Sequence, residues 1–136
     1  MATNSKAAKK SEITTSLAWF QIPADDVSRA KEFYSGLFDW KVNRFPNSPP
    51  GEHEYIDTRG ADTSPDGGLI KRTDAEHTIT IYSNVPSVAK FLTKVEKLGG
   101  SIREPKTAIP GRGYLATCKD TEDDTFAVWE RNSKAK

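Results

Sequence analysis

Histidine and cysteine, two of the side chains that most often carry catalysis, are scarce in this chain, which has two His and one Cys, and their simplest catalytic arrangements are missing. His53 and His77 do not have the spacing of two histidines on one helix face that a metalloprotease needs, and neither is paired with a nucleophile. We expect both histidines at a loop or strand edge. Glu54 and Glu130 could serve as acid–base groups, and Glu130 is the weak catalytic candidate, although carboxylates at strand edges are usually solvated.

A second chemical feature is the segment Gly111-Arg112-Gly113-Tyr114. Flanking glycines allow the backbone to approach a ligand closely, and the Arg112 guanidinium is suited to holding an anion. An ordinary loop before a strand is the preferred interpretation of the segment. We therefore keep Arg112 as a candidate ligand-binding residue beside that simpler interpretation.

These residues lie on secondary-structure elements whose order occurs twice in the sequence. Residues 18–42 read as strand, turn, amphipathic helix and strand, and residues 77–103 repeat that order. Each copy is followed by further short strand-like runs, so the pattern predicts two βαβββ modules over residues 14–73 and 77–131. The fold class is α+β, with mixed sheets that curl into a cup or barrel. The predicted strands are 17–22, 41–45, 53–57, 68–72, 77–83, 101–104, 113–119 and 125–130.

Helical spacing defines the two predicted helices. Asp25 or Asp26 caps a helix that extends to about Phe38, and Gly99-Gly100 ends the second helix in the left-handed conformation that glycine permits. The apolar positions predict which sides are buried. They are Val27, Ala30, Phe33, Tyr34, Leu37 and Phe38 in the first helix, and Val88, Phe91, Leu92, Val95 and Leu98 in the second.

Strand alternation separates an aliphatic face from a mixed aromatic and polar face. We expect the aliphatic faces, such as Ile79 and Ile81, to pack beneath the helices. The other face then lines a small-molecule site, because such sites combine aromatic walls with a few polar groups. The predicted lining residues are Trp19, Gln21, Thr80, Tyr82, Tyr114 and Trp129. A dimer interface or a closed core is the alternative use of these side chains.

Bulk properties exclude several classes of protein. The 136 residues carry 20 Lys and Arg against 19 Asp and Glu, so no overall field attracts nucleic acid or anionic membranes. The single cysteine, Cys118, excludes an internal disulfide and reads as a small buried filler. Residues 1–13 and 132–136 read as disordered tails without a secretory signal, and no apolar run is long enough to span a bilayer. We expect a cytoplasmic protein.

The chain resembles the vicinal oxygen chelate superfamily, which includes glyoxalase I, bleomycin-resistance proteins and extradiol dioxygenases. The resemblance covers about residues 14–131, and its motifs are specific for the fold and weakly specific for the activity. It implies that the two modules form cups that pair, often across a dimer, around a cavity. Four segments carry it: Trp19-Phe-Gln-Ile-Pro-Ala-Asp-Asp, Arg29-Ala-Lys-Glu-Phe-Tyr-Ser-Gly-Leu-Phe-Asp-Trp, Lys97-Leu-Gly-Gly, and Gly111-Arg-Gly-Tyr through Lys119-Asp to Phe126-Ala-Val-Trp-Glu.

The resemblance also implies where a divalent metal would bind. The enzymes of the family hold their metal with His, Gln or Glu, and the matching positions here are Trp19 or Gln21, the segment 68–70, Thr80 and Ala127. These residues do not supply the imidazole and carboxylate ligands that a transition metal prefers. We predict no tightly bound metal and no other cofactor, with a loosely held divalent metal kept as the alternative.

Three functions remain in order of preference. The first is a homodimer that binds a small organic molecule in the strand-lined cavity without a tightly bound metal, as bleomycin-resistance relatives do. The second is a lyase or isomerase related to lactoylglutathione lyase, using Gln21, Glu54 or Glu130 with a loosely held metal. The third is a structural or regulatory dimer without a ligand. Nucleic acid and membrane are not predicted partners.

Overall fold

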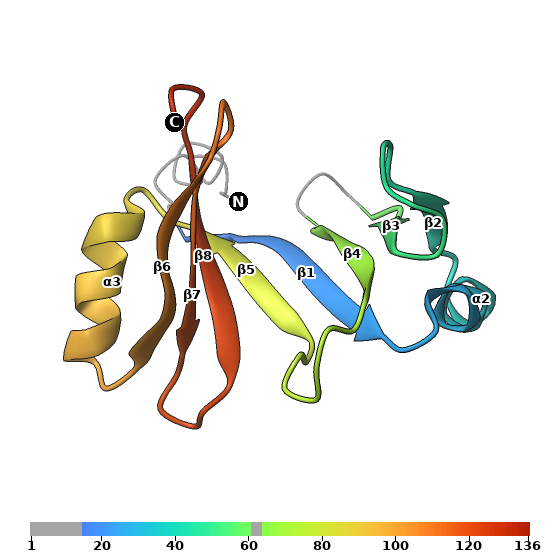
Figure 1. Ribbon diagram of the computed structural model, residues 1–136, viewed down its shortest axis with the longest axis horizontal. Helices are drawn as coiled ribbons and strands as arrows, with labels where there is room; N and C mark the ends of the chain where they lie inside the picture. The colour runs from blue at the N-terminus through green and yellow to red at the C-terminus, as the bar shows by residue number, and fades with distance from the viewer. Residues whose placement is uncertain (1–14, 61–63) are drawn as a thin grey trace, which may run out of the picture. The chain divides into compact units, whose positions relative to one another are not determined.

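The computed structural model describes residues 15–60 and 64–136. Eight strands and two helices lie in these residues, and neither helix is long and apolar enough to cross a bilayer. In chain order (Figure 1) they are β1 Leu17–Ala24, α2 Val27–Leu37, β2 Lys41–Arg44, β3 His53–Asp57, β4 Asp66–Lys71, β5 Thr80–Asn84, α3 Val88–Lys97, β6 Ser101–Ile109, β7 Gly113–Lys119 and β8 Thr125–Arg131.

The chain divides into two compact units that repeat one element order. The N-terminal unit is Ala18–Ile81, and the C-terminal unit is Tyr82–Lys136 together with the segment that ends at Leu17. Strands in the N-terminal unit follow the order β2-β3-β4-β1, with β1 and β4 parallel and the other pairs antiparallel. The order in the C-terminal unit is β5-β8-β7-β6. This arrangement confirms the predicted α+β class with mixed strand pairing.

Helix α2 covers one face of the N-terminal sheet. Asp26 caps it, because its side chain accepts a hydrogen bond from the backbone N–H of Arg29 at 2.9 Å. The prediction of its buried side is wrong for Phe33, Leu37 and Phe38, which are 61%, 59% and 43% exposed. These three side chains lie outside the core that α2 forms with the sheet. The core beneath α2 consists of Ile22, Ala24, Val27, Val42, Ile56 and Leu69, with Phe20, Ala30, Tyr34 and Trp40 packed against it.

Helix α3 covers one face of the C-terminal sheet. Ser87 caps its N-terminus, and Gly99, at φ 100°, follows its C-terminus in the predicted left-handed conformation. Leu98, which was expected to be buried, is 73% exposed because it lies beyond the last helical turn. The core beneath α3 consists of Val85, Val88, Ala116 and Val128, with Phe91, Leu92, Tyr114 and Phe126 against it.

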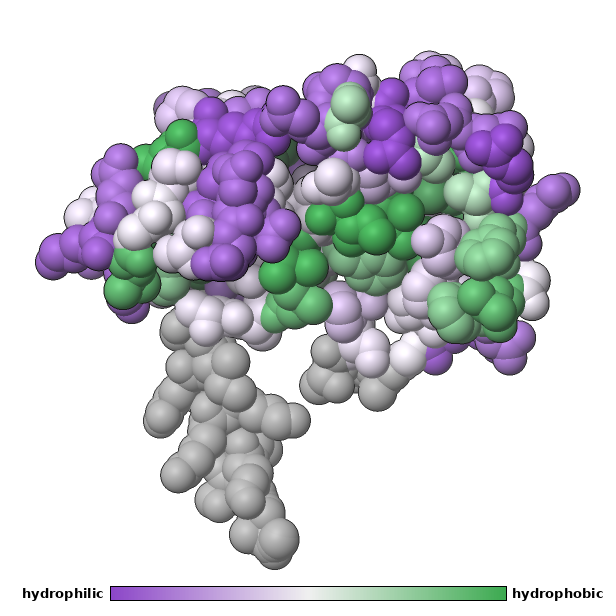
Figure 2. Space-filling view, turned by 90° about the horizontal axis from the view of Figure 1, so that it is seen from below, coloured by the Kyte–Doolittle hydropathy of each residue, from purple (hydrophilic) through white to green (hydrophobic). Residues whose placement is uncertain are grey.

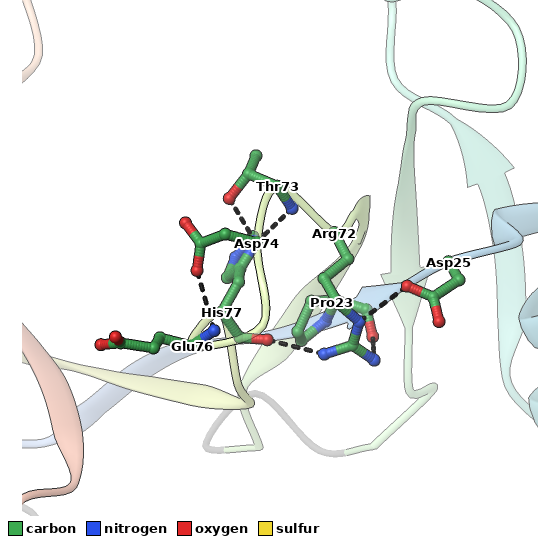
Figure 3. A network of polar contacts seen from close by, with 7 residues as sticks. All are labelled: Pro23, Asp25, Arg72, Thr73, Asp74, Glu76 and His77. Carbon is green, nitrogen blue, oxygen red and sulfur yellow. Dashed lines mark hydrogen bonds and ion pairs between the residues drawn. The ribbon is translucent and has the colours of Figure 1, made fainter.

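Strand β5 begins later than predicted because an arginine holds the preceding segment in a turn. The Arg72 side chain donates to the backbone oxygens of His77 and Pro23 at 2.7 and 3.3 Å and pairs with Asp25 at 2.9 Å (Figure 3). The backbone N–H of His77 donates to Asp74 O, also within this turn. His77 is therefore unavailable for strand pairing, and the strand starts at Thr80.

The two ends of the chain differ from one another. The predicted N-terminal tail, residues 1–13, lies outside the described residues. Residues 132–136 are not a free tail, because Ala135 is buried and its carbonyl accepts a hydrogen bond from Gly111 N at 2.9 Å. Asn132 N likewise donates to Arg112 O at 2.8 Å. The last residues thus pack onto the β6–β7 turn.

Candidate functional site

The face of the N-terminal sheet opposite α2 gathers aromatic and polar side chains, and we call it the open face. Strand register places Gln21 beside Gly68, and Gly68 beside Tyr55. Trp19 and His53 are two residues from Gln21 and Tyr55 along their strands, so alternation puts them on the same face. The open face therefore joins two predicted residues, Trp19 and Gln21, to two that were not predicted as ligand-binding.

Aromatic rings cover much of the open face. The Trp19 ring lies with its centroid 5.4 Å from that of Tyr55 and 6.1 Å from that of Phe45. Phe45 in turn contacts the His53 ring at 4.1 Å and the Tyr55 ring at 5.5 Å. Edge-to-face and tilted contacts of this kind stabilise an aromatic cluster.

Most polar groups on this face already have partners. The Trp19 indole N–H donates to Gln21 Oε1 at 2.9 Å, and the Tyr55 hydroxyl donates to Asp66 Oδ2 at 2.7 Å. That hydrogen bond to a carboxylate is the main reason that the pKa of Tyr55 is raised to about 12, with burial adding to it. Tyr55 is therefore a fixed neutral phenol rather than a base.

His53 is the exception. Its Nε2 atom exposes less than 1 Å² and has no hydrogen-bond partner, and it is the one buried side-chain polar atom of this kind in residues 15–60 and 64–136. Burial lowers the pKa of His53 below 6.5, and neighbouring Glu54 opposes that shift only in part, so the ring is neutral at pH 7. Sequence reasoning placed His53 at an exposed edge. Its parity with Tyr55 was the signal that could have placed it on this face.

A bare patch of backbone lies at the centre of the open face. A Cβ added to Gly68 would lie 3.1 Å from Gln21 Oε1, 3.1 Å from Trp19 Cζ2 and 3.2 Å from His53 Nε2. Three side chains, of Trp19, Gln21 and His53, thus converge beside Gly68. Any larger residue would push them aside.

Glu54 does not belong to this site. It follows His53 by one residue, so it points to the opposite face of β3, beneath α2. There it is buried, and its carboxylate pairs with the Lys31 ammonium at 3.2 Å. The acid–base role that was considered for Glu54 in the cavity is inconsistent with this placement.

In the C-terminal unit, the face opposite α3 carries two of the predicted ligand-binding residues. Trp129 lies on it, paired with Leu115 and stacked over the backbone of Gly113. Tyr82 is half-buried, and burial together with the charge of Glu104 raises its pKa. Thr80, in the N-terminal unit, is buried and donates its hydroxyl to Thr78 O at 2.9 Å.

Tyr114 does not lie where it was predicted. In β7, Tyr114 points to the opposite face from Leu115 and to the same face as Ala116. It therefore packs against the core beneath α3, on the other side of the sheet from Trp129. The Lys106 ammonium lies 4.2 Å above its ring. Arg112 lies in the exposed β6–β7 turn after Gly111, which has a φ of 76°, and it makes no ion pair in the described part of the chain.

Glu130, the weak catalytic candidate, has a structural partner. Its Oε1 atom accepts a hydrogen bond from the backbone N–H of Val88 at 2.9 Å. Val88 is the first residue of α3, and a carboxylate there satisfies a free amide and complements the helix dipole. This contact gives the Glu130 carboxylate a structural role, so no catalytic role is needed to explain it.

The positions that the resemblance assigns to a metal do not fit one here. Gln21 Oε1 already accepts from Trp19, Gly68 has no side chain, and Thr80 donates to its own strand. Ala127 offers no donor atom. Within the described ranges, no group of three or more His, Cys, Asp or Glu lies close enough together to bind a metal ion. The donor set is unsuited to a transition metal.

A surface groove of about 420 Å³ lies elsewhere in the N-terminal unit, near the N-terminus of α2. Its charges are largely engaged, because Asp25 pairs with Arg72 and Asp26 caps the helix. The open face, by contrast, holds His53 Nε2, a buried polar atom without a hydrogen-bond partner. The groove is lined by Ile22, Pro23, Ala24, Asp25, Asp26, Arg29, Ala30, Phe33, Tyr34 and Arg72.

Comparisons with known proteins point to one family. Residues 16–128 match the model of the Glyoxalase/Bleomycin resistance protein/Dioxygenase superfamily. A glyoxylase-like domain-containing protein of Didymella fabae is 29% identical over 122 residues, covering 87% of this chain and 95% of that protein. The anthracycline biosynthesis protein DnrV of Streptomyces peucetius is 27% identical over 135 residues. The match covers 84% of this chain and 46% of DnrV, so this chain spans about half the length of that relative.

Solved structures agree on the fold. A glyoxalase/bleomycin resistance protein/dioxygenase superfamily member from Vibrio splendidus 12B01 superposes with a TM-score of 0.62 at 11% identity, covering 88% of this chain and all of that one. A hypothetical protein from Bacillus halodurans C-125 gives 0.60 at 15% identity, covering 90% and 99%. At such low identities the likeness concerns the fold alone.

Proposed function

Because this chain belongs to the Glyoxalase/Bleomycin resistance protein/Dioxygenase superfamily, we propose that it binds a small organic molecule on the open face of its N-terminal sheet, without a tightly bound metal. Trp19 and Gln21 are the binding residues expected from the sequence, and the structure adds Phe45, His53 and Tyr55 as their neighbours. Tyr82 and Trp129 are the candidates in the C-terminal unit, and Arg112 remains a candidate for an anionic ligand.

One observation carries the proposal: a cluster of aromatic rings surrounds polar atoms on a sheet face that no helix in the described residues of the N-terminal unit covers. Aromatic walls with a few polar groups are the usual composition of a small-molecule site. The hydrogen-bonded Trp19–Gln21 pair and the unpartnered Nε2 of His53 supply the polar part. Neither Glu54 nor Glu130 supports the alternative lyase, because each is engaged with α2 or α3.

The proposal is tested by fluorescence titration of the protein with a library of aromatic compounds. Trp19→Ala should weaken binding by about 1–3 kcal/mol through lost aromatic contact, while the fold survives. The matched control is Trp40→Phe, since Trp40 packs beside Tyr34 and Phe38 on the side of α2. If Trp19→Ala unfolds the protein, Trp19 is a core residue and the proposal fails.

The metal-free part of the proposal has its own measurement. Elemental analysis of the dialysed protein should find no stoichiometric Zn, Ni, Fe or Mn, because the aligned positions lack a suitable donor set. About one transition metal per chain would instead favour the lyase.

We also propose that the protein is a cytoplasmic homodimer. The apolar side chains that α2 leaves exposed, Phe33, Leu37 and Phe38, support an unassigned apolar contact. Ile79 and Ile81, which were expected beneath a helix, are 59% and 48% exposed in the same unit. Figure 2 shows apolar groups in green that reach the surface among the hydrophilic ones.

A further inference from the structure

Strand β6, at the edge of the C-terminal sheet, contains an irregularity that turns Glu104 onto the face opposite α3, which we call the C-terminal face. Ile102 pairs with Cys118, but Glu104, two residues later, pairs with Thr117, so β6 has one residue more than β7 over this stretch. A second register shift follows between Glu104 and Thr107. Such β-bulges re-aim side chains, and they occur often at sheet edges and beside functional sites. Without the first bulge, alternation would put Glu104 on the face of Ile102.

Glu104 shares the C-terminal face with Trp129. Opposed residues of an antiparallel pair lie on one face, so Glu104 lies on the face of Thr117. The Thr117 hydroxyl donates to Glu104 Oε1 at 3.4 Å, in agreement with this placement. Thr117 is two residues from Leu115, the partner of Trp129, and alternation therefore puts Trp129 on the same face.

Tyr82 lies on the C-terminal face from the opposite edge strand, β5. It is three residues from Val85, which belongs to the core beneath α3, so alternation directs Tyr82 away from that helix. Burial raises the pKa of Tyr82, and the charge of Glu104 raises it further, although β8 and β7 separate their strands. A carboxylate and two aromatic side chains therefore occupy one sheet face.

No cation of the described residues forms an ion pair with Glu104. The neighbouring Arg103 directs Nη1 at Thr125 Oγ1, 3.5 Å away. The Lys119 ammonium pairs with an aspartate of the β7–β8 turn at 3.6 Å, and Arg131 is the last residue of β8, at the β6–β7 end of the sheet. The Glu104 carboxylate is also exposed, so a ligand reaches it without any rearrangement of the protein.

This combination of groups favours a positively charged ligand. A carboxylate attracts a cation through its charge, and the negative faces of aromatic rings attract the same cation. A neutral or anionic molecule gains neither effect. The apolar part of an organic cation gains contact with the rings as well.

We infer that the C-terminal face binds a small organic cation, with Glu104 as the residue that selects its charge and Trp129 and Tyr82 as its aromatic contacts. The inference rests on the part of the proposed function that concerns the C-terminal unit, and it adds a ligand class and a specificity-determining residue there. It does not depend on the open face of the N-terminal sheet.

Three probes that differ in charge test the inference: 2-phenylethylamine, which is a cation at pH 7, neutral 2-phenylethanol and anionic 3-phenylpropanoate. Calorimetry at low salt should show that the wild-type protein binds the amine roughly tenfold more tightly than the alcohol, and the anion most weakly. Glu104→Gln keeps the size of the side chain without its charge, and it should remove most of the preference for the amine. The matched control is Glu96→Gln on the exposed side of α3, which removes an equal charge on the other side of the sheet and should leave the preference unchanged.

A second measurement uses only the wild-type protein. In the ¹⁵N-labelled chain, the amine should shift the indole N–H resonance of Trp129 more than the alcohol does. Equal affinities for the amine and the alcohol, or a preference that persists in Glu104→Gln, would overturn the inference. A neutral aromatic probe that shifts Trp19 while the amine leaves Trp129 unmoved would overturn it too, and would leave the proposed function of the open face standing.

Discussion

At the scale of single residues, His53 separates what alternation could predict from what it could not. Its place on the open face follows from the period of a strand, since Tyr55 lies two residues away. The His53 ring packs against Phe45 across the β2–β3 hairpin, and the Trp19 indole, which comes from β1, converges with it beside Gly68. That convergence has no local signature, so the sequence predicted Trp19 and Gln21 and missed the histidine beside them.

The lowered pKa of His53 predicts a dependence of stability on pH. The unfolded chain binds a proton at His53 near pH 6.5, whereas the folded chain binds it only at lower pH. The free energy of unfolding should therefore fall as the pH drops below about 6.5 toward the folded-state pKa. Urea titrations at pH 7 and pH 5 measure this fall, and it should be smaller in His53→Phe. An equal fall in both proteins would show that His53 is not buried in this way.

Gly68 gives a second prediction at this scale. An added methyl group would lie 3.1–3.2 Å from the side chains of Trp19, Gln21 and His53, so Gly68→Ala should displace them and change the tryptophan emission. The control is Gly36→Ala on α2, where nothing lies within 4 Å. That change should stabilise the protein by about 0.5–1 kcal/mol and leave the emission unchanged. Identical emission spectra for Gly68→Ala and the wild type would contradict the crowded open face.

At the scale of elements, Arg72 fixes the connection between β4 and β5. Arg72→Ala removes two hydrogen bonds to backbone oxygens, of Pro23 and His77, and should lower the free energy of unfolding by about 1–3 kcal/mol. Asp25→Ala is the control. It removes only an exposed ion pair, which is worth about 0–1 kcal/mol. Thermal or urea unfolding of both variants measures the difference, and equal losses would assign the effect to the ion pair.

Most elements could be predicted from local pattern, and the exceptions have long-range causes. Both helices, the cap at Asp26, the glycine stop after α3 and the repeated strand order follow from spacing and capping chemistry. The start of β5 could not be predicted in this way, because Arg72 binds the backbone of His77 from outside the strand. Tyr114 was assigned to the wrong face because the phase of a strand relative to its helix is set by packing, here beneath α3.

At the scale of the whole molecule, the exposed side chains of α2 bear on assembly. If they form the proposed homodimer contact, sedimentation should give a species of twice the 15.1 kDa chain mass at micromolar concentration. Phe33→Glu should dissociate it without unfolding, because this side chain is 61% exposed in the single chain. A 15.1 kDa species alone in the wild-type protein would contradict the homodimer.

The central claim is that an aromatic molecule binds on the open face beside Trp19. The chain has three tryptophans, so the indole N–H resonances of the ¹⁵N-labelled protein report separately on Trp19, Trp40 and Trp129. Titration with an aromatic probe such as 2-naphthol should shift the Trp19 resonance most, since the probe would lie against its ring, and leave that of Trp40, which packs on the side of α2, unchanged. A saturating shift at Trp40 with Trp19 unmoved, or no shift at any tryptophan, would contradict the claim.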